Sequence, residues 1–131
     1  MATVNLSNES QQIITGNDNI VIVDVFATVR GGRSLEVTGF TPLVINAGHV
    51  IIKETATSEY KPMPIASATT YGTLPAGHTY AGVLIASILT AKAFAAILTQ
   101  GTINPVAAPY DFATIAAAFK TAMPLIDQRA D

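Results

Sequence analysis

The stretch YAGVLIASILTAKAFAAILT, from Tyr80 to Thr99, decides the fold class of this chain. Its length matches that of a membrane-spanning helix, and Lys92 is its one charged residue. A charge near the middle of such a span costs about 2.5 to 3.5 kcal/mol, and the flanks lack basic residues and an aromatic belt. We therefore interpret the stretch as two buried strands joined by a turn at Thr90 to Lys92, and we expect no membrane partner. The residues expected to be buried in these strands include Val83, Ile85, Ile97 and Leu98.

The composition excludes several classes of function. Of the 131 residues, 50% are hydrophobic and 12% are charged, which is typical of one folded domain and not of a disordered chain. The seven Lys and Arg residues are scattered singly and the net charge is −2, so we expect no nucleic-acid partner. The absence of cysteine excludes disulfides and thiolate metal ligands. The first residues lack the basic and apolar runs of a secretory signal.

The first 39 residues are interpreted as an arm followed by a hairpin. Residues 1–19 are rich in Asn, Ser, Gln and Gly, which predicts a flexible arm that has little to offer a core. The β-branched run IVIVDVFATV (residues 20–29), the RGGR turn and the alternating segment SLEVTGF (residues 34–40) together predict the hairpin.

The run over residues 20–29 is also a candidate binding element. Asp24 is its only charge, and an exposed strand of this kind pairs with the sheet edge of another chain. We predict that residues 1–39 dock on a partner and that residues 40–131 form the β-rich domain. The alternative is that the hairpin packs on its own domain. The predicted docking residues are Ile20, Val21, Ile22, Val23, Val25 and Phe26.

The remaining residues predict short strands and one closing helix. TPLVI and HVIIKET flank a Gly-containing connection at residues 46–48, which predicts a second hairpin. Residues 58–78 hold three prolines and are interpreted as loop and edge strand. The fold class is therefore mainly β (α+β), a small single domain of short antiparallel strands with an N-terminal arm and a C-terminal helix. The helix is predicted before Pro124 from four apolar residues at spacings of 3, 4 and 4: Phe112, Ile115, Phe119 and Met123.

The residue types that form catalytic and metal sites give only weak indications of such a site in this sequence. His49 and His78 each lie beside a glycine and have no partner at metal-ligand spacing, so we interpret both as polar turn residues. No serine lies in a G-x-S-x-G elbow, and the Gly31-Gly32 turn lacks the phosphate-loop pattern. We expect no enzymatic activity, no cofactor and no metal.

A domain this poor in charge is expected to have part of its apolar surface covered by a partner. The proline-rich segment holds aromatic and proline side chains that are typical interface anchors. The alternative is that its tyrosines form the walls of a pocket in a ligand-binding or adhesion module. The predicted anchors are Tyr60, Pro62, Pro64, Tyr71 and Tyr80.

Four short segments and the helix that follows them carry a resemblance to a known family. They are G-x-V-I from Gly48, TATSEYKPM, AGVL and AAILTQGTIN, and with the helix they cover about residues 40–128. In this order they resemble the lambda-type head decoration proteins of tailed bacteriophages. The resemblance implies a homotrimer that binds the major capsid protein on the outer surface of an expanded virion head and stabilises the shell. The hairpin-like segment of residues 19–40 is longer than the N-terminus of that family, so a head-fibre protein is the alternative.

Overall fold

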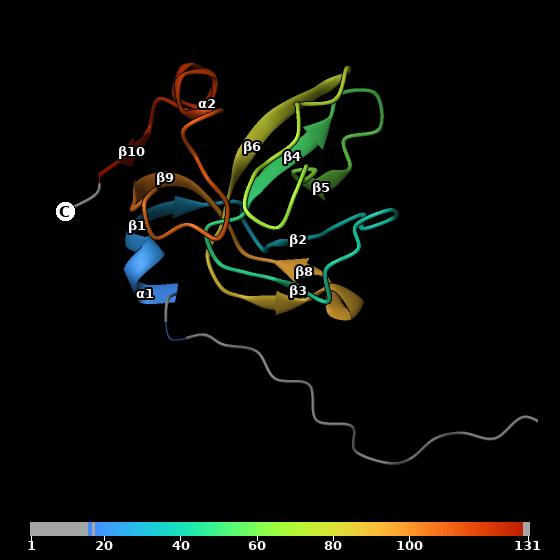
Figure 1. The fold of residues 1–131 in the computed structure, drawn as a ribbon, viewed down its shortest axis with the longest axis horizontal. Helices are drawn as coiled ribbons and strands as arrows, with labels where there is room; N and C mark the ends of the chain where they lie inside the picture. Colours follow the sequence, from blue (N-terminus) through green and yellow to red (C-terminus); the bar gives the residue numbers. More distant parts are fainter. Residues whose placement is uncertain (1–15, 17, 130–131) are drawn as a thin grey trace, which may run out of the picture.

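The computed structural model describes residue 16 and residues 18–129, which form one small, mainly β domain (Figure 1). Most of the predicted arm, residues 1–15 and 17, lies outside the described residues. The elements in chain order are α1 (Asp18–Val21), β1 (Ile22–Thr28), β2 (Arg33–Ser34), β3 (Val44–Ile45), β4 (Val50–Glu54), β5 (Tyr60–Pro62), β6 (His78–Leu84), β7 (Ile88–Leu89), the 3-10 helix η1 (Thr90–Lys92), β8 (Phe94–Ala95), β9 (Ile97–Ile103), α2 (Ala116–Ala122) and β10 (Ile126–Gln128).

The main sheet has the strand order β1-β9-β6-β4-β5, and β10 pairs with β9 in parallel. The other pairs of this sheet are antiparallel, as predicted for the domain. Two further pairs, β2 with β8 and β3 with β7, form small sheets below the main one (Figure 1). Strand β1 therefore belongs to the same sheet as strands from the middle and the end of the chain.

Both predicted hairpins are wrong. Strand β1 pairs with β9, and β2 pairs with β8. The turn at Gly31 and Gly32 leads the chain away from the main sheet, and Gly32 lies against the Phe94 ring of β8, where a Cβ would clash. Strand β3 likewise pairs with β7, while β4 enters the main sheet. In both cases the predicted turn is present, but the two strands that flank it pair with other strands and not with each other.

The core lies on both faces of the main sheet. In β4, Val50 and Ile52 face one hydrophobic cluster and Ile51 faces the other, because successive side chains of a strand point to opposite faces. Val83 and Leu98 likewise face the first cluster, which α2 covers. Burial on both faces explains why these strands are continuous apolar runs without a polar alternation. The second cluster, covered by the small sheets, consists of Leu35, Ile45, Ile51, Leu84, Ala95 and Ile97.

The stretch from Tyr80 to Thr99 does contain buried strands. Val83, Ile97 and Leu98 are fully buried, and the predicted turn at Thr90–Lys92 is the helix η1. Ile85 departs from the prediction, because it lies just after β6 and is only partly buried. Among the described residues, no helix is long and apolar enough to cross a membrane.

The C-terminal helix is present but shorter than its apolar pattern suggests. Helix α2 spans Ala116–Ala122, so only Phe119 of the four predicted face residues lies in it; Phe112 and Ile115 precede it, and Met123, which is partly buried, follows it. Their side chains are nevertheless buried with Phe119 against the sheet, as the predicted apolar face requires. After Pro124 the chain adds strand β10 to the sheet, an element that the sequence did not suggest.

Candidate interaction surface

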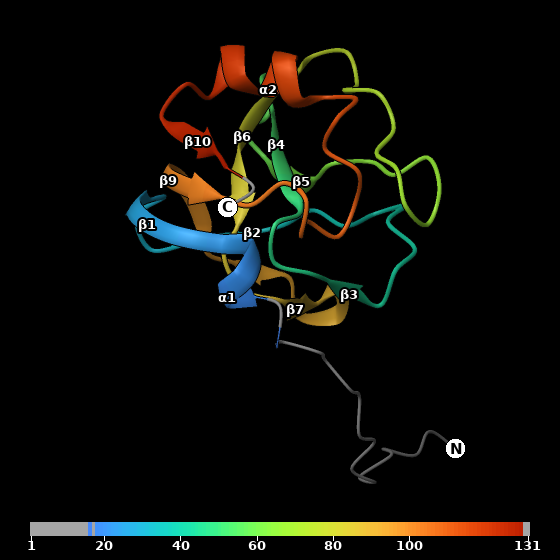
Figure 2. The same cartoon turned by 60° about the vertical axis from the view of Figure 1, so that its left-hand side comes forward.

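Strand β1 forms one edge of the main sheet. Its inner side pairs with β9, from Ile22 opposite Ile103 to Thr28 opposite Leu98. Among the described residues, no strand pairs with its outer side. Figure 2 turns this edge toward the viewer, with α1 directly below it. Unpaired backbone N–H and C=O groups along an edge are a template for pairing with another chain.

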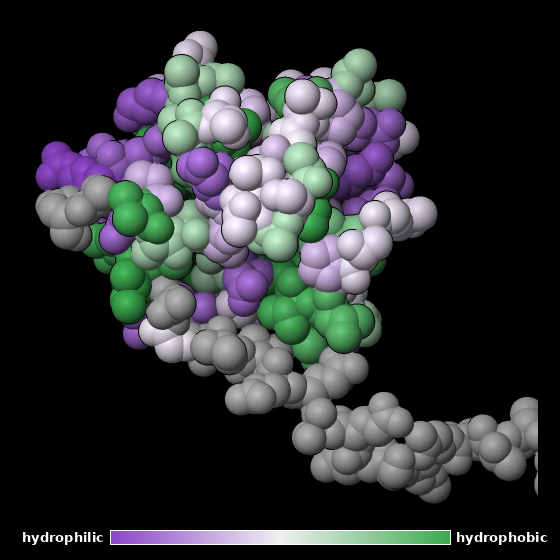
Figure 3. Space-filling model, in the orientation of Figure 1, coloured by the Kyte–Doolittle hydropathy of each residue, from purple (hydrophilic) through white to green (hydrophobic). Residues whose placement is uncertain are grey.

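Four of the six predicted docking residues expose their side chains here. Phe26 is 77% exposed, Val23 54%, Ile20 52% and Val25 46%. Figure 3 shows hydrophobic surface on the side of the molecule where α1 and β1 lie. We call Ile20, Val23, Val25 and Phe26 the β1 patch. It combines a free strand edge with apolar side chains, which makes it the candidate interaction surface.

The other two predicted docking residues are part of the core. Val21 is 2% exposed, and its side chain fills the space beside Gly48 where a Cβ would clash. Ile22 is 8% exposed and lies opposite Ile103. Val21, the last residue of α1, and Ile22, the first residue of β1, both face the core, so they hold β1 in place and are not available to a partner. The side chain of Asp18 secures the same helix, because it accepts hydrogen bonds from the backbone N–H and the hydroxyl of Ser87.

The opposite edge of the sheet is protected. The backbone N–H of Glu36 donates to the carbonyl oxygen of Tyr60 in β5 at 2.8 Å, so the chain itself covers part of that edge. Charged side chains follow it, including an ion pair of 3.3 Å between Lys61 and Glu54. Natural proteins use covering segments and charges to block edge pairing. On β1 the only charged residue is Asp24. The β1 edge is therefore open to a partner strand, whereas the β5 edge is partly blocked.

The predicted interface anchors do not form one surface. Pro62 and Tyr71 are buried, whereas Tyr60, Pro64 and Tyr80 are half-buried. The Tyr71 hydroxyl accepts a hydrogen bond of 3.0 Å from the backbone N–H of Val50, and burial raises the pKa of Tyr71. Tyr60 packs on the cluster at the opposite face of the sheet from Tyr71 and Tyr80. The structure therefore separates the three tyrosines that a single ligand pocket would need.

Tyr71 and Tyr80 do share a groove of about 620 Å³ beside α2. Its other lining residues are mostly small or apolar, and none is charged: Ala66, Gly72, Thr73, Leu74, Thr114, Ile115 and Ala118. A small-molecule site normally adds a few convergent polar groups to its apolar walls. This groove offers threonine hydroxyls and the tyrosines alone.

His49 is not the polar turn residue that the sequence predicted. Its side chain is completely buried, and its Nε2 lies 2.9 Å from the carbonyl oxygen of Met63. Desolvation lowers the pKa of His49 to about 4, although the hydrogen bond to Met63 opposes the shift. One signal was present in the sequence, because His49 directly precedes the continuous apolar run of β4. His78, in contrast, lies near the surface, and its Nδ1 is 2.9 Å from the carbonyl oxygen of Ala76.

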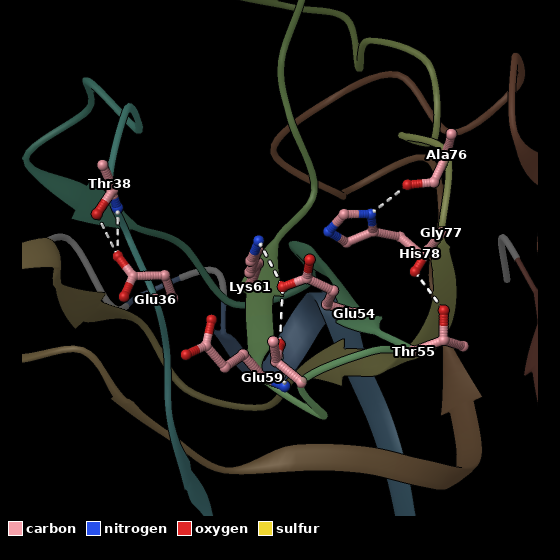
Figure 4. Close-up of polar contacts among 10 residues, drawn as sticks. Glu36, Thr38, Glu54, Thr55, Glu59, Lys61, Ala76, Gly77 and His78 are labelled. Atoms are coloured by element: carbon pink, nitrogen blue, oxygen red, sulfur yellow. Dashed lines mark hydrogen bonds and ion pairs between the residues drawn. The ribbon is translucent and has the colours of Figure 1, made fainter.

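Polar side chains gather where β4 ends and where β5 and β6 begin (Figure 4). Figure 4 shows Glu54 and Lys61 facing each other from neighbouring strands. Hydrogen bonds from Thr57 and Lys61 lower the pKa of the Glu54 carboxyl, and hydrogen bonds from Thr38 lower that of Glu36. These contacts close exposed turns. In the part of the chain that the structure describes, no group of three or more His, Asp and Glu side chains is placed to hold a metal ion.

Comparisons of this chain with protein-family models, with curated proteins and with solved structures found no match.

Proposed function

We propose that this chain is a structural virion protein, a homotrimeric decoration protein that binds the major capsid protein on the outside of an expanded phage head and stabilises the shell. It has no enzymatic activity in this account. The proposal starts from the resemblance of residues 40–128 to the lambda-type head decoration proteins. The mainly β single domain is compatible with it.

The observation that carries the proposal is the β1 patch on a free sheet edge. A long, apolar edge strand without lysine or proline is a liability for a protein that stays alone in solution. Pairing with a strand of another chain supplies main-chain hydrogen bonds, and these do not demand a particular partner sequence. Such binding suits a shell protein that meets several quasi-equivalent positions on one head.

The mechanism is cementing by mass action. A protein that binds the expanded shell and not its precursor shifts the equilibrium toward the expanded state. Contacts made only in the assembled lattice are sufficient for this, so no catalytic group is required. A trimer presents three β1 patches to the shell at once, and the combined binding exceeds that of one patch.

The mass of the purified protein in solution tests the oligomeric part of the proposal. We expect a trimer in analytical ultracentrifugation at high micromolar concentration, because closed symmetry covers apolar surface. A chain that is monomeric at high micromolar concentration and also when bound to heads contradicts it.

The second candidate is a head-fibre, adhesion or ligand-binding module on the virion surface. The groove shared by Tyr71 and Tyr80 favours it. Saturation-transfer NMR with small glycans and aromatic ligands tests this candidate. Saturation transfer from the protein to a ligand that disappears in Tyr80→Ala supports a ligand site at this groove, and absence of transfer contradicts it.

A further inference from the structure

His49 lies where three loops meet the main sheet. Its ring makes edge-to-face contacts with Phe40, Tyr71 and Tyr110, with ring centroids 5.3 to 5.4 Å apart. Phe40 belongs to the loop after β2, Tyr71 to the proline-rich loop and Tyr110 to the loop after β9. The fourth contact is the hydrogen bond of its Nε2 to Met63. One buried imidazole therefore joins segments from four parts of the chain.

The hydrogen bonds of His49 determine which nitrogen carries the proton. Since the Met63 carbonyl only accepts, Nε2 must be the donor and Nδ1 must be the unprotonated nitrogen of the neutral ring. Nδ1 is buried and has no hydrogen-bond partner among the described residues. A proton added in acid therefore goes to Nδ1, where the described residues offer the new N–H no acceptor and the charge is buried away from the surface.

Among the residues that the structure describes, no neighbouring group balances that charge. The titratable side chains that face the ring are Tyr71 and Tyr110, both neutral over the acidic range. Asp111, beside Tyr110, is exposed and accepts a hydrogen bond from the backbone N–H of Ala113. Glu36, on the loop of Phe40, is exposed and is engaged by Thr38. An ionised imidazole in these surroundings is unfavourable.

We infer that His49 is an acid-sensitive latch: while neutral it holds the loops of Phe40, Tyr71 and Tyr110 on the sheet, and its protonation releases them. The role is independent of the decoration function, because none of these residues belongs to the β1 patch. The direction of the pH effect on stability follows from the linkage between proton binding and folding. In the unfolded chain histidine titrates near pH 6.5, so the unfolded state binds the proton first as the pH falls. The stabilisation is complete above pH 6.5 and is lost progressively toward pH 4.

The first test is an NMR titration of the unmodified protein from pH 8 to pH 3.5. We expect the His49 ring to stay neutral well below pH 6.5, the ordinary pKa of histidine, and to take up its proton near pH 4. The protection factors of the amides in the three loops, corrected for the pH dependence of intrinsic exchange, should fall as it does so. The inference is overturned if His49 titrates near pH 6.5, or if the loops keep their exchange protection while His49 becomes charged.

The second test compares the pH dependence of unfolding in His49→Gln with that in His78→Gln. Between pH 7 and pH 4 the folding equilibrium constant of the unmodified protein should fall on the order of 100-fold through His49. His49→Gln should lose this part of the pH dependence even if it is less stable at pH 7, whereas His78→Gln should keep it. The carboxyl groups contribute equally to the unmodified protein and to His49→Gln, so they cancel in that comparison. An unchanged profile in His49→Gln contradicts the latch, and if this variant does not fold, the titration alone decides.

Discussion

Gly82 of β6 lies against the carbonyl oxygen of Leu98 in β9, in a space that a Cβ would fill. The glycine has a φ of 153° and lies in the middle of the sheet, between β4 and β9. Its missing side chain allows the two backbones to approach. The close pairing of β6 with β9 therefore depends on this one residue.

The first prediction is that Gly82→Ala destabilises the domain by about 1 to 3 kcal/mol or more, because the added methyl group meets backbone that cannot move aside. Gly72→Ala is the matched control, since its Cβ would lie at an ordinary 3.4 Å from the Pro64 carbonyl oxygen. Urea unfolding of both variants measures the difference. Equal stability of the two variants is incompatible with the close approach of β6 and β9.

A second prediction concerns Ile97, which is completely buried in β9. Ile97→Ala should lower the free energy of unfolding by about 2 to 5 kcal/mol, from lost burial and the cavity left behind. Leu125→Ala removes a side chain of the same size that is 62% exposed, so its effect should stay within about 0.5 kcal/mol. Chemical denaturation distinguishes these outcomes, and similar losses in both variants contradict the assigned core.

The third prediction is that a chain lacking residues 1–39 does not fold. The deletion removes β1, which covers β9, and also Leu35 of the second cluster. A chain that lacks only residues 1–15 keeps every described element and should fold. Circular dichroism and amide proton dispersion report both results. A folded fragment of residues 40–131 shows that the first 39 residues are separable after all.

The fourth prediction separates the β1 patch from the stability of the domain. Phe26→Lys places a charge on the free edge, where it opposes strand pairing, and the 77% exposure of Phe26 means that folding should be little affected. We expect the variant to remain trimeric in sedimentation velocity, because the β1 patch binds the shell and not the other subunits. Val106→Lys, at a residue in the loop after β9 that is 80% exposed, is the control and should also remain trimeric. Loss of the trimer in Phe26→Lys alone would place the patch between subunits and not on the shell.

The sequence predicted what depends on residue type and spacing alone. Runs of apolar residues predicted the buried strands that contain Val83 and Leu98. The spacing of apolar residues near the C-terminus predicted the buried side chains of Phe112, Ile115 and Phe119. Strand partners were not predictable, because residues such as Ile22 and Ile103 lie far apart in the sequence and no local pattern pairs them. A glycine turn such as Gly31-Gly32 indicates that the chain changes direction, but it does not indicate which strand the following segment will pair with.

The same limit applies to the candidate site. The β-branched run at residues 20–29 correctly marked a strand with exposed apolar residues. That Val21 and Ile22 face the core follows from α1, a single turn of helix whose sequence gives no distinct signal. The prediction that His49 is an exposed turn residue is wrong because Phe40, Tyr71 and Tyr110, each from a different loop, bury its ring.

Binding to emptied, expanded phage heads tests the central claim most directly. In a co-sedimentation assay we expect saturable binding to expanded heads, little binding to unexpanded ones and at least tenfold weaker binding of Phe26→Lys than of Val106→Lys. Failure of the folded, unmodified protein to sediment with expanded heads contradicts the decoration function, and equal binding of the two variants contradicts docking through β1.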